Sequence, residues 1–340
     1  MNNNKNNFLF PSNPFFSLHN TTSTTTTVLS DTTTTTWLDE CSNTKKFALE
    51  RARKLTAPIP KSKTKGDIED VTFWDDHNCL LDQARSEWGK KHDSLYRFDD
   101  YFVTNYLNPK IRKALESKSL RQLKSTVVPV SNNIYKIKEA FTPQFIDVLL
   151  NELDYQENSG IPLRRPNGMN RYGCILNDLG FESVLKELSD KLFKPLIHAL
   201  YPNRINVIRD LTTEYGFVVK YLPGADTNLK EHADASTITI NLCLIPSTTN
   251  HPLYFKNIRE INSSSSEGAI ITENVTLDVG GDVLIHLGQH IHGVSDVTSE
   301  RSNMILWLMG DYGYVRVAPY NLNEIYNNQQ LFHSIYPDWN

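Results

Sequence analysis

The second half of the chain is a series of short hydrophobic runs separated by polar turns. The segments 216–222 and 237–245 are rich in β-branched and aromatic residues, which favour strands. Five further strand-like runs are predicted at 204–211, 252–255, 269–279, 283–287 and 304–309. Turn signals such as Gly280-Gly281 separate several of these runs. Many short strands in succession are typical of a β-sandwich or jelly roll.

Helical periodicity precedes these strands. The segment 181–200 repeats apolar residues at helical spacing, which predicts an amphipathic helix that lies on a sheet. Thr142 and Pro143 are suited to the cap and the first turn of another helix, over 143–155. Helices that support a predominantly β core indicate the α+β class.

The N-terminal third has a different pattern. Residues 1–36 are an Asn-, Thr- and Ser-rich tail that cannot bury enough apolar surface to become ordered. Residues 37–126 are predicted to be mainly helical, with one helix beginning at Pro109 and continuing to 123. The basic stretch 45–65 suits either a nuclear-import or phosphate-binding patch or a solvated charged face, and we favour the solvated face. The predicted regions are a disordered tail at 1–36, a helical region at 37–126, a β-rich domain at 127–312 and an irregular C-terminal tail at 313–340.

Composition narrows the classes of function. A net charge of −4 over 340 residues gives no indication of a nucleic-acid partner. No apolar run has the length of a membrane span, and the N-terminus lacks the pattern of a secretory signal. The four cysteines show no C-x-x-C spacing, as expected for free thiols in a reducing compartment. We therefore expect a cytoplasmic protein, with the nucleus as an open alternative.

The segment 229–237 (NLKEHADAS) holds His232 and Asp234 two residues apart. Residues i and i+2 of a strand point to the same face, so these two side chains would reach one ion together. A third ligand would complete a two-histidine, one-carboxylate set, the arrangement of non-haem Fe(II) oxygenases. Because His-x-acid occurs by chance in a chain of this composition, a polar strand face with a solvated acid is equally compatible with the dyad alone.

A second segment, 282–308, contributes three histidines and then Arg301. A guanidinium holds a carboxylate bidentately, which is what a 2-oxoglutarate enzyme requires. Alternatively, Arg301 pairs with Glu300 or Asp296 on a turn, where the pair would contribute little stability. His286, His290 and His292 compete for the third ligand position, and strand parity does not separate them, since Gly288 interrupts the strand.

Several of these motifs recur in order. These motifs are RPNGMNRYGCILNDLG (165–180), FVVKY (217–221), EHADASTITINLCL (231–244), LYF (253–255) and VLIHLGQHIHG followed by SERSNMILWL. Together they resemble the Fe(II)/2-oxoglutarate dioxygenase domain of the prolyl and lysyl hydroxylase type. The resemblance covers roughly residues 160–312 and is strongest to the 2-oxoglutarate and iron-dependent oxygenase domain-containing protein 2 group and its plant relatives. It implies a double-stranded β-helix (jelly roll) core.

The resemblance also implies roles for individual residues. His232, Asp234 and His292 match the family's catalytic metal ligands, Arg301 matches the residue that holds the far carboxylate of 2-oxoglutarate, and Tyr221 matches a tyrosine near the cosubstrate. The implied cofactors are Fe(II), 2-oxoglutarate and O2, with ascorbate as the reductant. The implied reaction hydroxylates a C–H of a protein side chain or small molecule and releases succinate and CO2.

Two other classes of function stay open on the sequence. The domain could bind metal without turnover, as an interaction or sensing module, although all the expected ligands are present. It could also be a cupin-type metal enzyme that uses a different oxidant, with Arg301 in a structural role. Production of succinate separates these alternatives. The primary substrate, whether protein lysine, protein proline or a small molecule, is not indicated by the sequence.

Overall fold

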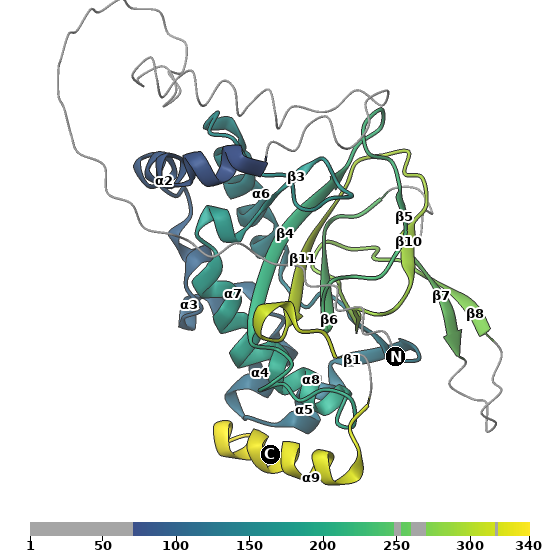
Figure 1. Ribbon diagram of the computed structural model, residues 1–340. Coiled ribbons are helices and arrows are strands. Elements are labelled where there is room, and N and C mark those ends of the chain that lie inside the picture. The colour runs from purple at the N-terminus through teal and green to yellow at the C-terminus, as the bar shows by residue number, and fades with distance from the viewer. Residues whose placement is uncertain (1–70, 248–252, 260–269, 317–318) are drawn as a thin grey trace, which may run out of the picture.

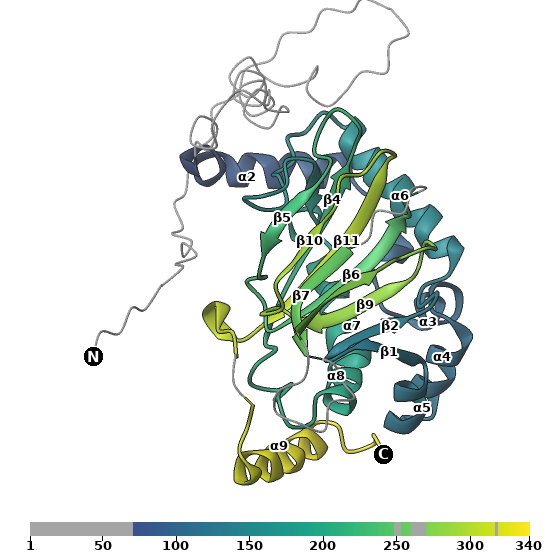
Figure 2. The same ribbon diagram turned by 90° about the vertical axis from the view of Figure 1, so that its right-hand side faces the viewer.

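The computed structural model describes residues 71–247, 253–259, 270–316 and 319–340 (Figure 1). Within these residues, two antiparallel β-sheets lie face to face, and helices cover the outer face of the larger sheet (Figures 1 and 2). The predicted tail at 1–36 and the basic stretch at 45–65 lie outside the described residues. No helix in the described ranges has both the length and the apolar character needed to cross a membrane.

The larger sheet has seven strands in the order β1-β2-β9-β6-β11-β4-β3, and the smaller has four in the order β5-β10-β7-β8. The strands are β1 (Val127–Ser131), β2 (Ile134–Ile137), β3 (Gly173–Ile175), β4 (Thr213–Tyr221), β5 (Leu229–His232), β6 (Ile238–Ile245), β7 (Leu253–Arg259), β8 (Ile270–Val275), β9 (Val283–Leu287), β10 (His292–Val294) and β11 (Arg301–Met309).

From β4 onward the chain passes back and forth between the two sheets. It places β4, β6, β9 and β11 in the large sheet and β5, β7, β8 and β10 in the small one. Every neighbouring pair of strands is antiparallel. This connectivity is that of a jelly roll, or double-stranded β-helix, and it confirms the predicted fold class.

The large sheet is buried on both faces. On β11, Met304, Leu306 and Leu308 pack with the helices in the main core, whereas Ile305 belongs to a second apolar cluster between the sheets. This alternation follows from the period of two residues along a strand. Consistent with this, β6 and β11 are buried along almost their whole length. The polar residues described in the next section lie in the same space between the two sheets as this second cluster.

Helices occupy most of the remaining chain (Figure 1). They are α2 (Val71–Trp88), η3 (Asp93–Tyr96), α3 (Asp100–Tyr106), α4 (Pro109–Glu116), α5 (Leu120–Ser125), α6 (Pro143–Asn158), η4 (Asn177–Leu179), α7 (Glu182–Leu188), η5 (Ser189–Phe193), α8 (Lys194–Leu200), η6 (Asp311–Gly313) and α9 (Leu322–Ile335). The Thr142 hydroxyl accepts a hydrogen bond from Phe145 N, and Pro143 occupies the first turn of α6, as predicted.

The N-terminal helices pack into the same hydrophobic core as the large sheet. Phe102, Ile111 and Leu123 are fully buried in it together with β-sheet residues. The buried carboxylate of Glu152 on α6 accepts hydrogen bonds from the Tyr96 hydroxyl and from the backbone N–H groups of residues 91 and 92. Residues 71–125 are therefore integrated with the jelly roll through shared packing and a shared hydrogen-bond network.

Three predicted elements differ from the structure. The helix expected over 109–123 is two helices, because Lys118 adopts a left-handed conformation (φ 48°) between α4 and α5. The helix expected over 181–200 includes a π-helical segment, η5, between α7 and α8. Residues 204–211 form turns instead of a strand. There the Asn206 and Asp210 side chains accept backbone hydrogen bonds and compete with strand pairing.

The C-terminal segment 313–340 was expected to be irregular, and this was wrong. It contains α9, whose start is fixed by a reciprocal capping box between Asn321 and Glu324. The helix is anchored to the body of the protein through Phe332, which is buried, and through the Asn328 amide, which accepts from Asn206 Nδ2. Only a narrow part of α9 faces the core, so its apolar periodicity is weak.

Candidate metal centre

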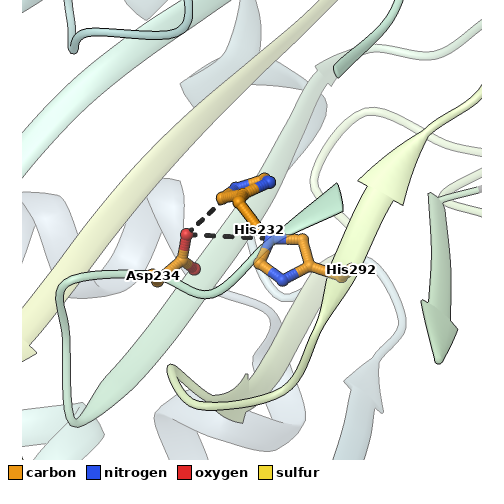
Figure 3. A group of neighbouring side chains, drawn as sticks. All are labelled: His232, Asp234 and His292. Carbon is orange, nitrogen blue, oxygen red and sulfur yellow. Dashed lines mark ion pairs between the residues drawn. The ribbon is translucent and has the colours of Figure 1, made fainter. Parts of the chain in front are cut away.

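His232, Asp234 and His292 meet in the interior between the two sheets (Figure 3). One potential ligand atom from each lies within 4.8 Å of the others. Asp234 Oδ1 is 3.3 Å from His232 Nε2 and 3.7 Å from His292 Nε2, and the two imidazole ring centres are 4.3 Å apart. The structure thus brings together the three residues that the sequence singled out as metal ligands.

The backbone of the small sheet positions the two histidines. His292 is the first residue of β10 and lies opposite His232, the last residue of β5. Gly293, beside His292, is favoured by close packing, since a Cβ there would lie 2.9 Å from the backbone oxygen of Leu229 on β5. The His-Gly pair is thus explained by the narrow space between β10 and its neighbours.

Asp234 reaches the cluster differently from the prediction. We expected both members of the dyad on one strand, but β5 ends at His232 and Asp234 lies in the turn that follows. Its backbone N–H donates to Gly288 O at 2.8 Å, and a Cβ on Gly288 would lie only 2.0 Å from Ser236 O. A close approach of two turns, not strand periodicity, therefore aims the carboxylate.

Hydrogen bonds fix which ring nitrogen of each histidine is available. His232 Nδ1 is 2.8 Å from Lys230 O, and His292 Nδ1 is 2.9 Å from His290 O. A carbonyl only accepts, so each Nδ1 carries a proton, and Nε2 is the ring atom of each histidine that is left to bind a metal. Two neutral Nε2 atoms and one carboxylate are a donor set suited to a divalent transition metal. The residues present therefore fit an Fe(II) ion.

Burial and charge set the protonation of the cluster. Burial alone would raise the pKa of Asp234, but the hydrogen bond with His232 and the neighbouring imidazoles hold that pKa at about 2. Burial lowers the pKa of His292. Burial opposes the charged form of His232 as well, yet its contact with Asp234 raises its pKa above the ordinary value. The carboxylate is consequently ionised and available at neutral pH.

The other two histidines of the second segment have separate positions. His290 is not part of the three-residue cluster, and burial lowers its pKa to about 4. His286 lies on β9, almost fully buried, with Nε2 4.0 Å from Asp234 Oδ2. Its Nδ1 is 2.9 Å from Leu287 O, and burial lowers its pKa to about 3. His286 is therefore a neutral imidazole close to the Asp234 carboxylate and outside the three-residue cluster.

The cluster opens into a cavity of about 380 Å³ between the sheets. Arg301, the first residue of β11, lines this cavity and lies opposite Tyr221 at the end of β4. The guanidinium carbon is 5.7 Å from the centre of the Tyr221 ring. Arg301 and Tyr221 thus line the same cavity as the metal cluster.

The Arg301 guanidinium is buried without an acidic partner in the cavity. The side chain is 5% exposed, and Nη1 makes no hydrogen bond within the described residues. Within the described residues no ion pair joins Arg301 to Glu300 or Asp296, so the alternative in which Arg301 closes a turn does not describe the structure. Burial lowers the pKa of Arg301. A buried cation with an unused donor is costly, and an anionic ligand would offset that cost.

Several residues of the site were not found from the sequence. Asn303 and Asn241 line the cavity beside Arg301, and Thr239 donates a hydrogen bond to Asp234 Oδ2. Asn303 and Arg301 precede the strand predicted at 304–309, but β11 begins at Arg301, so the two side chains lie on the same face. The polar segment 165–172 contributes residues 167–170 to the cavity wall.

The chain is similar to proteins named as 2-oxoglutarate and iron-dependent oxygenases. Residues 84–206 match the family model described as the OGFOD2-like domain. The chain is 31% identical over 239 residues to the 2-oxoglutarate and iron-dependent oxygenase domain-containing protein ICU11 of Arabidopsis thaliana, covering 68% of this chain and 58% of that protein. It is 32% identical over 232 residues to the 2-oxoglutarate and iron-dependent oxygenase domain-containing protein 2 of Danio rerio, covering 67% and 65%.

The chain spans less than two thirds of the length of these two relatives. The family match at 84–206 also includes helices that precede the segment 160–312, in which the sequence resemblance was noted. Among solved structures, a prolyl 4-hydroxylase of Phytophthora capsici is similar with a TM-score of 0.42 and 11% identity, covering 68% of this chain and 76% of that one.

Proposed function

The chain contains an OGFOD2-like domain and is a relative of the 2-oxoglutarate and iron-dependent oxygenase domain-containing proteins, and on this premise we propose that it is an Fe(II)- and 2-oxoglutarate-dependent dioxygenase. The observation that carries the proposal is the pairing, in one cavity, of a two-histidine, one-carboxylate cluster with a buried arginine. The cluster suits the metal, and the arginine suits a dicarboxylic cosubstrate.

His232, Asp234 and His292 would hold the iron. Bound iron and 2-oxoglutarate would supply the oxidative chemistry, in which O2 is consumed, 2-oxoglutarate becomes succinate and CO2, and a substrate C–H is hydroxylated. The carbonyl groups of Lys230 and His290 would hold a ring proton on each Nδ1, so that each histidine would bind the metal through Nε2. Thr239 fixes the Asp234 carboxylate through a hydrogen bond to Oδ2, leaving Oδ1 directed at the histidines.

The cavity itself would bind and orient the cosubstrate. Arg301 would hold the carboxylate far from the metal, with Tyr221 packed beside the guanidinium. Apolar side chains on the same walls, Phe217, Val219 and Ile305, would exclude water from the bound molecule. Water exclusion strengthens the charged hydrogen bonds to Arg301 and protects the reacting atoms from side reactions.

The finer aspects of the function belong to the same proposal. The target would be a C–H group of a protein side chain or of a small molecule, as in prolyl or lysyl hydroxylation, and ascorbate would serve as reductant. We also propose a reducing compartment, the cytoplasm or nucleus. The thiols of Cys79, Cys174 and Cys243 are free, which supports that location.

One experiment tests the proposal against its alternatives. The purified full chain is supplied with Fe(II), O2, ascorbate and 2-oxoglutarate, and succinate is measured by mass spectrometry without a primary substrate. The proposal predicts succinate in proportion to enzyme. A metal-binding interaction module or a cupin-type enzyme with another oxidant would give no succinate. Lysine- and proline-containing peptides and small molecules are then screened for a mass gain of one oxygen and for stimulated succinate formation.

A further inference from the structure

Two amide side chains continue from Arg301 along the wall of the cavity. Arg301 Nε donates to Asn303 Oδ1 at 3.0 Å, and Asn303 Nδ2 donates to Asn241 Oδ1 at 2.8 Å. All three residues line the cavity and are buried: Arg301 is 5% exposed, Asn303 1% and Asn241 8%. Arg301 and Asn303 share one face of β11, and Asn241 comes from the adjacent strand β6. The three side chains form a continuous polar relay.

The guanidinium dictates the direction of this relay. Because a guanidinium has donors and no acceptor, Asn303 must present its oxygen to Arg301. The Asn303 nitrogen then faces Asn241, whose oxygen must accept. Each amide is therefore held in one orientation by the group before it.

The relay orients Arg301 without neutralising it. An amide oxygen fixes Nε but carries no net charge, whereas a carboxylate at the same place would form an ion pair with the guanidinium. Among the residues that line the cavity, Asp234 is the only carboxylate, and it belongs to the metal cluster. The charge of Arg301 and its unpartnered Nη1 are consequently left for a ligand.

We propose that Asn303 and Asn241 are positioning residues that set the plane of the Arg301 guanidinium for the far carboxylate of a 2-oxo dicarboxylic acid. This inference rests on the proposed function. A bidentate contact requires both donors of the fork to lie in the plane of the carboxylate, so a freely rotating guanidinium would bind less tightly. The neutral character of the relay matters as much as its geometry, since it preserves the attraction for the anion.

The test compares two five-carbon acids that differ only at the far end. 2-Oxopentanoate carries a methyl group where 2-oxoglutarate carries its far carboxylate. Dissociation constants for both are measured by calorimetry on the full chain loaded with Mn(II), which avoids turnover. In Asn303→Asp, an acceptor for Nε remains, but its charge cancels that of Arg301. We expect the dissociation constant for 2-oxoglutarate to rise at least about tenfold, equal to about 1.4 kcal/mol, while that for 2-oxopentanoate changes little.

A second variant protects the test against misfolding, because Asn303→Asp places a carboxylate against the Asn241 oxygen. Asn241→Leu keeps the volume and leaves Arg301 and Asn303 in place, but it frees the Asn303 amide to rotate. A smaller loss of preference for 2-oxoglutarate is expected. Asn323→Asp on the exposed start of α9 is the matched charge control and should behave like the unmodified protein.

The ratio of the two dissociation constants separates positioning from general damage. A merely structural role would weaken both acids together or neither, so an unchanged ratio in both variants would overturn the inference. If the unmodified protein itself shows no preference for 2-oxoglutarate, then the proposed cosubstrate is wrong, and the positioning role fails with it. A preference that is present in the unmodified protein and lost in Asn303→Asp supports both.

Discussion

His292 on β10 lies directly opposite His232 on β5. On its other side, His292 pairs with Phe255 on β7. The pairing register of the small sheet therefore determines the distance between two of the three cluster residues. A slip of one residue would move His292 to the opposite face of the sheet and separate the imidazoles. Packing of Phe255, which is fully buried and 5.5 Å from the His292 ring centre, opposes such a slip.

The first prediction separates two histidines that are two residues apart. His292→Ala removes one nitrogen ligand and should abolish nearly all Fe(II)-dependent turnover, because the remaining pair holds the metal weakly. His290→Ala is the matched control, since His290 lies outside the cluster, and it should keep most of the turnover. Metal content after gel filtration and succinate formation are measured for both. The reverse ranking of the two variants would show that the third ligand is assigned to the wrong histidine.

The second prediction concerns Arg301. Replacing it with Ala removes the only unpaired cation found in the described cavity, and charged hydrogen bonds contribute roughly 1.5–3 kcal/mol each. The apparent constant for 2-oxoglutarate should therefore rise at least about tenfold. Fe(II) affinity should change little, because the arginine is not in the three-residue cluster. Arg301→Lys should restore only part of the loss, since an ammonium lacks the planar fork. Equal dependence on 2-oxoglutarate in all three proteins would refute this role.

The third prediction tests whether the N-terminal helices are part of one cooperative unit. Glu152 accepts hydrogen bonds from Tyr96, Gln156 and two backbone N–H groups while fully buried. Glu152→Ala leaves these donors without an acceptor and should lower the free energy of unfolding by at least about 2 kcal/mol. The exposed Glu116→Ala should stay within about 0.5 kcal/mol. Urea denaturation measures both, and a negligible effect at Glu152 would argue against the shared core.

The fourth prediction concerns how the protonation of His198 makes the stability of the protein depend on pH. His198 stacks on Phe332 of α9, with ring centres 3.7 Å apart. Burial lowers the pKa of His198 from 6.5 to about 4. Between these values the unfolded chain binds a proton that the folded protein does not, so stability falls as the pH falls through that window. His198→Phe should show a shallower loss between about pH 7 and about pH 5. Chemical denaturation at the two pH values is the measurement, and an unchanged slope would contradict it.

The jelly roll could be predicted because its strands are short, apolar and regularly punctuated. The metal ligands could be predicted only in part. His-x-Asp spacing identified His232 and Asp234, but the reason given, a shared strand, was wrong, since Asp234 is held by a turn that contacts Gly288. Strand parity could not distinguish His290 from His292. The family resemblance selected His292, and the structure places it in the cluster.

Other features depended on contacts between distant segments. The strand expected at 204–211 is replaced by turns because Asn206 and Asp210 satisfy the backbone there, and Asp210 also accepts from the Tyr320 hydroxyl. α9 was missed because its apolar periodicity is weak, although Asn321 and Glu324 have the spacing of a capping box. The relay from Arg301 to Asn241 joins two strands whose pairing the sequence alone does not specify.

The central claim is that one cavity binds a metal and 2-oxoglutarate together. Calorimetric titration of 2-oxoglutarate into the full chain, with and without Mn(II), tests it most directly, because ligands that share a site must change each other's affinity reciprocally. Mn(II) should tighten binding by about tenfold or more, and this gain should disappear in His292→Ala. Equal affinity for 2-oxoglutarate with and without Mn(II) in the unmodified protein would contradict the account.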